Sequence, residues 1–257
     1  MTRPDEATGA EVMNAAENRK THGAKMQFLI RRNTHSSREQ LIAHWFAHHM
    51  PRVIARNEAS EAAGEAHFSR YLVTLFDAQT DERNVWDGVA QLWLDEPMAR
   101  PAHASGTVPA DSFHEKAEPY WPWATEEWVF VDGLLPVEPL TLDAPYPCSR
   151  SGFVKQTSLV AARQEVDIDA MFSHWLEVHA PNVVRCMEEV GGIRYMVSLS
   201  TDLAHAPYAG MAELYFPDEL ARQAFWDIIE PDGFQDYADP ETTRRFVAST
   251  EFIGRER

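Results

Sequence analysis

The sequence predicts an α+β protein in which two ferredoxin-like units, each with the order βαββαβ, are fused in one chain and form a barrel between them. The first observation behind this fold is an octapeptide that occurs twice. Residues 44–51 and residues 174–181 both read H-W-x-x-x-H-x-P, 130 positions apart. The second observation is a pair of recurring strand motifs, and the third is the order of hydrophobic patterns within each copy. Self-similarity at a nearly constant offset indicates a duplicated structural unit.

The strand motifs extend the repeat well beyond the helix motif. Residues 70–75 (RYLVTL) match residues 194–199 (RYMVSL), and residues 88–93 (GVAQLW) match residues 210–215 (GMAELY). The smaller offsets of these pairs imply small differences in loop length, which folded proteins tolerate well. We therefore divide the chain into a mobile tail, a first unit, a proline-rich linker and a second unit, at residues 1–22, 23–133, 134–151 and 152–257.

The first unit is expected to begin with a strand at residues 26–30, followed by a helix. Ser36 and Glu39 form an S-x-x-E capping box, which marks a helix start. Pro51 removes an amide donor and clashes with the carbonyl four residues back, so we expect the helix to kink or end near His49. A further helical stretch is expected at residues 52–61, and strands at residues 68–76 and 88–94. Residues 96–124 are too rich in proline for a long helix, and a last strand follows at residues 128–131.

The second unit follows the same order with an intact second helix. Asp167 is expected to cap the helix that carries the repeated motif, and Pro217 suits the first turn of the second helix. Leu220 and Phe225 belong to the apolar stripe of that helix. In each unit the helices would cover one sheet face, and the two bare faces would pack together. The strands of this unit are expected at residues 154–160, 195–199, 210–216 and 246–253.

The composition limits the classes of partner. The 257 residues carry a net charge of -17, which argues against nucleic acid and against an anionic membrane surface, since both attract basic proteins. No apolar run reaches the length of a membrane span, and residues 1–22 lack a signal-peptide core. Two cysteines cannot build a disulfide framework, so a cytoplasmic location fits best. P-loop and G-x-G-x-x-G patterns are absent, so we expect no cofactor.

His49 and His179 are the candidate catalytic residues. Each stands two positions before the proline of its motif, where freed helix carbonyls could fix one tautomer, and an imidazole suits acid–base chemistry near neutrality. The alternative is that both only anchor the helix. His44 and His174 lie five residues earlier, so regular α-helical spacing places them on another side of the helix. His48 follows His44 at a zinc-like spacing, but no third ligand is evident and we expect no metal.

Alternation along the strands places four substrate-binding candidates on one face: Arg70, Gln91, Arg194 and Glu213. If this face points into the barrel, Arg194 and Glu213 would form an ion pair. Arg70, opposite the neutral Gln91, would then be available to bind a substrate carboxylate or phenolate. The alternative is that all four residues are solvated strand ends.

Aromatic residues form the last group of candidates. Tyr71 and Tyr195 fall on the opposite strand face, near the motif helix, where they could donate protons beside the histidines or simply pack. Trp45 and Trp175 belong to the repeated motif and are candidates for binding an aromatic substrate. Residues 119–123, with the sequence PYWPW, could line an aromatic pocket or fill the gap left by the broken helix.

The repeated helix motif and the strand at residues 87–93 (DGVAQLW) resemble the EthD family of the dimeric α+β barrel superfamily. Residues 208–216 (YAGMAELYF) show the same pattern, and the resemblance covers residues 24–133 and 152–254. It implies a pocket between sheet and helices and often cofactor-free chemistry on phenolic or polyketide-like compounds. The chain departs from the family pattern in its tandem fusion and in the broken second helix of its first unit, so we do not assume that the two sites are equivalent.

Three functional hypotheses follow from these residues and this resemblance. The first is a cofactor-independent lyase that decarboxylates or dehydrates an aromatic, phenolic compound by general acid–base catalysis. The second is a small-molecule-binding or stress-related protein without turnover. The third is a haem-dependent enzyme, because related barrels of the superfamily bind haem. Assembly into a homodimer is compatible with each of them.

Overall fold

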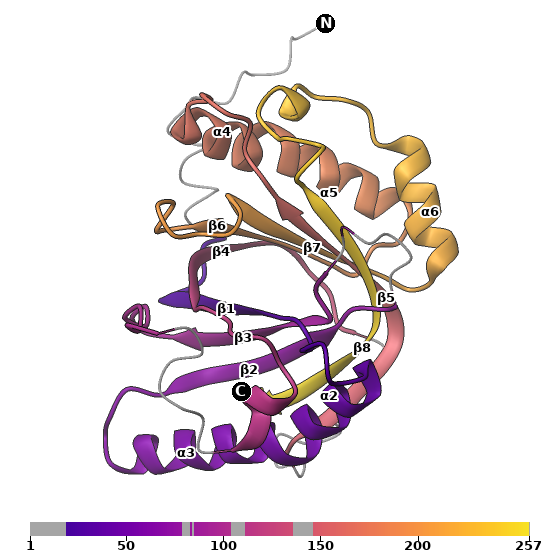
Figure 1. The fold of residues 1–257 in the computed structure, drawn as a ribbon. Coiled ribbons are helices and arrows are strands. Elements are labelled where there is room, and N and C mark those ends of the chain that lie inside the picture. Colours follow the sequence, from indigo (N-terminus) through magenta and orange to yellow (C-terminus); the bar gives the residue numbers. More distant parts are fainter. Residues whose placement is uncertain (1–18, 79–82, 84, 104–110, 136–145, 257) are drawn as a thin grey trace, which may run out of the picture.

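Eight strands of the described chain close into one antiparallel barrel (Figure 1). The computed structural model describes residues 19–78, 83, 85–103, 111–135 and 146–256. The first half supplies the strands β1 (Ala24–Ile30), β2 (Phe68–Leu75), β3 (Gly88–Leu94) and β4 (Trp123–Asp132). The second half supplies the strands β5 (Cys148–Val160), β6 (Arg194–Ser200), β7 (Gly210–Phe216) and β8 (Arg244–Arg255).

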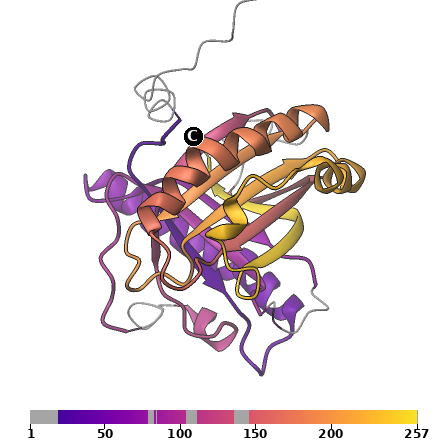
Figure 2. The same ribbon diagram turned by 90° about the horizontal axis from the view of Figure 1, so that it is seen from above.

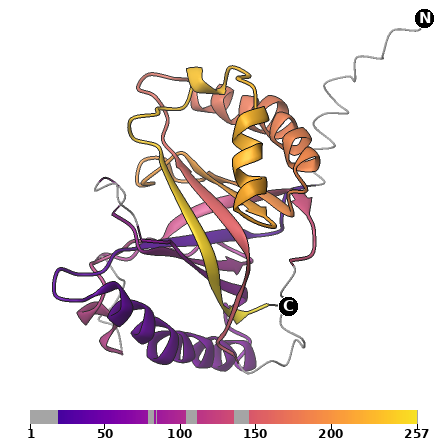
Figure 3. The ribbon, with the colours of Figure 1, turned by 90° about the vertical axis from the view of Figure 1, so that its right-hand side faces the viewer.

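Each half has the strand order of a ferredoxin-like unit, which is β4-β1-β3-β2 in the first half and β8-β5-β7-β6 in the second. The halves join at two seams, where β2 pairs with β8 and β4 pairs with β6. Figure 3 shows β8, in yellow, running beside β5 from the second half into the first. The predicted fold is confirmed, and the structure adds hydrogen-bonded seams to the expected packing of two bare sheet faces.

The helices lie outside the barrel, on the two faces away from its interior (Figure 1). The first half is covered by α2 (Arg38–His44), the π-helical turn η1 (Trp45–His49) and α3 (Met50–Ala62). The second half is covered by α4 (Ile168–His174), the π-helical turn η3 (Trp175–His179), α5 (Ala180–Glu189) and α6 (Glu219–Ile228). Figure 2 shows the orange helical segment of the second half lying across its strands. None of the described helices is both long and apolar enough to cross a membrane.

The repeated motif forms a continuous helix with one π turn in each half. The amide of Met50 donates to the carbonyl of Trp45, and the amide of Ala180 donates to the carbonyl of Trp175, which is the five-residue spacing of a π-helix. The expectation of a helix end or kink at His49 is therefore corrected. The regular α pattern is interrupted at the expected place, but the wider turn lets the chain pass the proline and continue as α3 and α5.

The first motif helix begins one residue later than predicted. Ser37 accepts a hydrogen bond from the amide of Gln40, and the side chain of Gln40 accepts one from the amide of Ser37. The segment Ser36-Ser37-Arg38-Glu39-Gln40 allows a capping box in either of two registers, and the sequence pattern alone favoured the wrong one. Asp167 caps α4 as predicted, because its carboxylate accepts from the amides of Asp169 and Ala170.

Several predicted boundaries are shifted. Residues 1–18 of the predicted tail and residues 136–145 of the predicted linker lie outside the described residues. Lys20 forms a bridge with Trp128, so the end of the tail packs against β4. The strand β5 begins at Cys148, inside the predicted linker, because its first residues pair with β8. The helix α6 starts after its cap, Asp218, and Leu220 is 75% exposed rather than part of its buried stripe.

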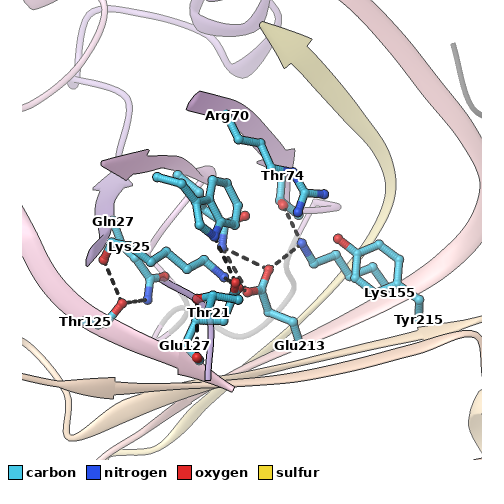
Figure 4. A network of polar contacts seen from close by, with 12 residues as sticks. Thr21, Lys25, Gln27, Arg70, Thr74, Thr125, Glu127, Lys155, Glu213 and Tyr215 are labelled. Carbon is cyan, nitrogen blue, oxygen red and sulfur yellow. Dashed lines mark hydrogen bonds and ion pairs between the residues drawn. The ribbon is translucent and has the colours of Figure 1, made fainter. Parts of the chain in front are cut away.

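A connected network of charged side chains lies inside the barrel (Figure 4). Lys25 contacts Glu127 and Glu213, and Lys155 contacts Glu213 and Glu251 at 2.6 and 2.8 Å. Glu213 therefore bridges two lysines, one from each half. The lysines outweigh the effect of burial, which alone would raise the pKa of Glu213, and lower that pKa to about 2.

Neutral donors complete the hydrogen bonding of the network, and a third cation balances its charge. The amide of Gln91 donates to Glu213 at 2.9 Å, the indole of Trp93 donates to Glu127, and the hydroxyl of Tyr215 donates to Glu251. Arg150 pairs with Glu251, so three cations face three carboxylates in this buried set. The predicted ion pair of Arg194 with Glu213 is wrong, because the buried lysines at the repeat-related positions 25 and 155 occupy that carboxylate.

Candidate functional site

The candidate site lies in the second half, where His179 meets Asp232 at the end of the π turn. The imidazole Nδ1 is 2.8 Å from Asp232 Oδ2. The same carboxylate accepts from the side chain of Asn182 at 2.9 Å and from the amide of Phe234 at 3.1 Å. An ionised carboxylate can only accept, so Nδ1 carries the proton and the lone pair of Nε2 is available. The ring of Phe234 stacks on the imidazole at 4.4 Å and fixes its plane.

The surroundings keep the imidazole neutral and the carboxylate charged. Burial lowers the pKa of His179 below its usual value, against the opposing effect of Asp232. Burial alone would raise the pKa of Asp232, but hydrogen bonds from Asn182 and His179 outweigh it and leave that pKa lowered. The pair is therefore an oriented neutral base at neutral pH.

A cavity of about 440 Å³ adjoins this pair, between the outer face of β5, β6 and β7 and the helices α5 and α6. Its walls are mainly apolar, with Val160, Leu214 and Phe225 among them. The polar groups that line it include Gln156, Ser158, Tyr195 and Arg245, together with His179. An apolar space with a few convergent polar groups is the usual form of a small-molecule site.

Two buried donors stand at the wall of this cavity without ordinary hydrogen bonds. The indole nitrogen of Trp175 lies near the hydroxyl of Tyr195. Neither atom completes a hydrogen bond of normal geometry with a described residue, and each side chain is only 1% exposed. Burial raises the pKa of Tyr195, so its hydroxyl stays protonated. The indole N–H points to the oxygen of Tyr195, which leaves the hydroxyl hydrogen of Tyr195 as the candidate donor to a ligand oxygen.

The π turn also brings a second histidine to the same carboxylate. His174 Nε2 is 3.8 Å from Asp232 Oδ1. In the first half, His44 Nε2 is 3.5 Å from the hydroxyl of Ser112, beside the corresponding Asp111. The expectation that these histidines lie on another side of the helix is wrong, because a π turn aligns residues five apart, whereas the α-helical period separates them.

The first half repeats the pair and adds two aromatic rings beside it. His49 Nδ1 is 2.9 Å from Asp111 Oδ2, and Phe113 stacks on its ring at 4.1 Å. Tyr120 packs edge-on against Phe113 and Phe28, with ring centroids 6.1 Å apart in both contacts. The position of Phe28 corresponds to Ser158 in the second half, where the cavity opens.

The remaining predicted residues are not brought together at the cavity. Arg70 pairs with Glu256 at 2.8 Å and lies over Trp93, and Arg194 donates to the carbonyl of Gly133 at 2.7 Å. Gln91 and Glu213 are inside the barrel. In the first half, Tyr71 and Trp45 are buried in the apolar cluster around Phe113. The structure thus brings three predicted residues together at one cavity: His179, Tyr195 and Trp175.

The sequence contained a signal for the missed carboxylates. Residues 111–117 (DSFHEKA) and residues 232–238 (DGFQDYA) share the pattern D-x-F-x-x-x-A at an offset close to that of the preceding strand motifs. In both copies the first residue holds the imidazole and the third stacks on it. Ser158 and Arg245 carry no comparable sequence signal, because their role depends on which strand face the cavity uses.

No family model and no curated protein matches the sequence. Solved structures match its fold. A protein described as anthrone oxidase-like aligns with a TM-score of 0.51 and 11% identity, over 94% of this chain and 96% of that one. A mutant chlorite dismutase from Candidatus Nitrospira defluvii aligns at 0.46 and 8%, over 89% and 92%. A haem-binding protein from Thermus thermophilus aligns at 0.38 and 13%, over 88% and 90%. The first of these likenesses shows a shared dimeric α+β barrel fold.

Proposed function

We propose that the chain is a cofactor-independent enzyme of lyase type that moves a proton on an aromatic, phenolic small molecule held in the cavity of its second half. One observation carries the proposal: a neutral imidazole, His179, oriented by Asp232 at the wall of an apolar cavity. Removal of carbon dioxide or water from an activated aromatic compound needs only positioning, proton transfer and exclusion of water.

The residues take distinct roles in this mechanism. His179 Nε2 takes a proton from the substrate, and the imidazolium then returns it to the departing hydroxyl in a dehydration, or to the carbon that loses carbon dioxide in a decarboxylation. Asp232 stabilises the imidazolium and keeps the ring in one tautomer. The hydroxyl of Tyr195, beside the indole of Trp175, would donate a hydrogen bond to a substrate oxygen on which charge develops. The apolar walls exclude water and strengthen each of these interactions.

We assign catalysis to the second half and a structural role to the first. Both halves hold a histidine against an aspartate, but Phe28 and Tyr120 occupy the space beside His49. Burial raises the pKa of Tyr120 to about 12, so it remains a neutral packing group. The histidine of the first half thus serves the alternative role considered from sequence, which is to anchor its helix.

The aromatic substrate class has two sources of support. The cavity is lined by rings of Trp175, Phe225 and Phe234. The solved neighbour described as anthrone oxidase-like shares the fold, and anthrone is an aromatic ketone. Membership of the EthD family remains part of the proposal, supported by the repeated helix and strand motifs.

A panel of phenolic acids and aryl ketones, with binding followed by tryptophan fluorescence and turnover by chromatography, tests the proposal. For an accepted substrate, His179→Ala should lower kcat by about a hundredfold or more with little change in binding. His49→Ala is the matched control and should leave the rate unchanged if it folds. Binding without any turnover would favour the alternative of a non-catalytic small-molecule-binding protein.

Haem is the second alternative, and the imidazole of His179 at the cavity wall could serve as a ligand to its iron. His179 would hold the iron through Nε2, with Asp232 as the carboxylate that commonly supports such a ligand. Haem bound there would supply redox chemistry in place of proton transfer. We expect the purified protein to show no Soret band. A haem titration that gives a shifted band in the wild type, but not in His179→Ala, would support haem binding instead.

A further inference from the structure

The mouth of the cavity carries a cation stacked on an indole. The guanidinium of Arg245, on β8, lies 4.9 Å from the ring centroid of Trp226, on α6, and both residues line the cavity. Trp226 is 39% exposed, although large aromatic side chains usually avoid solvent. Arg245 pairs with Ser158 across β5 and β8, so the two side chains share the sheet face that the cavity uses.

Hydrogen bonds to the barrel wall hold the indole of Trp226 in place. The indole nitrogen of Trp226 donates to Gln156 Oε1 at 2.8 Å, and Arg222 donates to the same oxygen at 3.3 Å. Arg222 is in turn held by Glu219 at 2.8 Å. Gln156 is only 3% exposed and belongs to the barrel wall, so its hydrogen bond restricts rotation of the indole. A preorganised cation–π pair loses little conformational freedom when a ligand binds.

The charges of the residues that line the cavity indicate which ligand the Arg245–Trp226 pair would bind. Among the described residues that line the cavity, Arg245 carries the one permanent positive charge, whereas Glu230 and Asp232 are acidic. The whole chain has a net charge of -17, so its general field repels anions. An anionic ligand must therefore find local attraction at Arg245. A guanidinium has five N–H donors in a planar fork that matches a carboxylate.

We infer that the substrate is an aromatic carboxylate, whose carboxylate is bound by Arg245 at the mouth of the cavity while its ring lies against Trp226 and the apolar walls. This inference rests on the proposed function of the same cavity and names its substrate class. It gives Arg245 the role of substrate clamp that the sequence suggested for Arg70 and Arg194. It also makes Arg245 a specificity residue, because a neutral ligand of the same shape gains nothing from it.

The test compares 2-naphthoate with its neutral analogue 2-naphthamide on the full chain, by calorimetry and tryptophan fluorescence. The wild type should bind the carboxylate more tightly than the amide. Arg245→Gln should weaken carboxylate binding by about tenfold, which corresponds to about 1.4 kcal/mol, and leave amide binding unchanged. Arg245→Lys should restore part of the preference. Arg100→Gln is the matched control, because Arg100 stacks on Trp121 at 4.2 Å in the first half and does not line the cavity.

An unchanged preference for the carboxylate in Arg245→Gln, or no preference in the wild type, would overturn the inference. The proposed function fails in a different way. If the carboxylate preference depends on Arg245 but turnover of every accepted compound survives in His179→Ala, the clamp stands and the acid–base role is wrong. If turnover depends on His179 while the preference ignores Arg245, the acid–base role stands and the clamp is wrong.

Discussion

The imidazole of His179 derives its chemical character from its immediate neighbours. Asp232 fixes the tautomer from one side, Phe234 fixes the ring plane from above, and burial keeps the ring neutral. In the first half the same three interactions surround His49, but Tyr120 packs there against Phe113 and Phe28. The two imidazoles are therefore held alike. We propose that His179 is active and His49 structural because only His179 is known to adjoin a cavity.

The lowered pKa of His179 predicts the acid limb of the rate profile. For the substrate found by the panel, kcat/KM should be constant above about pH 6.5, the usual value for histidine, and fall as the pH drops and the ring is protonated. Asp232→Asn removes the charge that raises the pKa of His179, so the limb should move to lower pH while the plateau falls by about a hundredfold. A limb at the same pH in both proteins would contradict the assignment of His179 as the base.

The pair Phe28 and Ser158 allows a second prediction. Ser158→Phe should fill the cavity and abolish ligand binding, with a change of less than about 1 kcal/mol in the free energy of unfolding, because the ring enters existing space. Phe28→Ser should lower the free energy of unfolding by about 2 kcal/mol, since it removes a packed ring from the first half. Urea denaturation and fluorescence titration measure both effects. Full binding by Ser158→Phe would show that the ligand binds elsewhere.

The helices show what a residue pattern can and cannot predict about an element. The motif H-W-x-x-x-H-x-P correctly predicted a helix disturbed before its proline. The kind of disturbance was not predicted, because the helical period assumed for the sequence was that of an α-helix. One additional residue in the turn is enough to bring His174 to Asp232. The carboxylates were missed for another reason: Asp111 and Asp232 lie in loops just before the short 3-10 turns Ser112–Glu115 and Phe234–Asp236, where no hydrophobic period marks them.

The capping register gives the prediction at this scale. Ser37→Ala should lower the free energy of unfolding by about 1 kcal/mol, since it removes the side chain that caps α2. Ser36→Ala is the comparison in the adjacent position and should cost less than Ser37→Ala, since the hydroxyl of Ser36 makes only a long hydrogen bond to the carbonyl of Glu115, at 3.3 Å. Chemical denaturation compares the two variants. A larger effect at Ser36 would restore the register that the sequence pattern favoured.

At the scale of the whole molecule, the barrel interior joins the two halves through buried charge. Lys25 comes from the first half, Lys155 from the second, and Glu213 contacts both. Exact symmetry would place a glutamate at position 91 as well, which would bury a fourth carboxylate among three cations. Gln91 avoids this and donates to Glu213 instead. The sequence showed the Gln91–Glu213 difference, but the lysine partners required knowledge of which strands meet across the barrel.

Glu213→Gln tests this network. The substitution leaves two buried lysines with one carboxylate fewer, and we expect a loss of about 3–5 kcal/mol in the free energy of unfolding at neutral pH. Because folding lowers the pKa of Glu213 to about 2, its contribution is complete above about pH 4.5 and declines as the pH falls towards 2. The gap between wild type and variant should therefore narrow over that range. Glu126→Gln, at an exposed ion pair with Lys20, is the control and should change little.

The two closed seams have a consequence for melting. In a chain of two independent domains, each domain can come apart while the other persists. Here β2 and β4 of the first half are hydrogen-bonded to β8 and β6 of the second. Neither half can therefore unfold without breaking the barrel that both halves form. Heating should consequently produce a single cooperative calorimetric peak, in which the van't Hoff and calorimetric enthalpies agree. The two copies of the duplicated unit should thus fold and unfold as one cooperative unit.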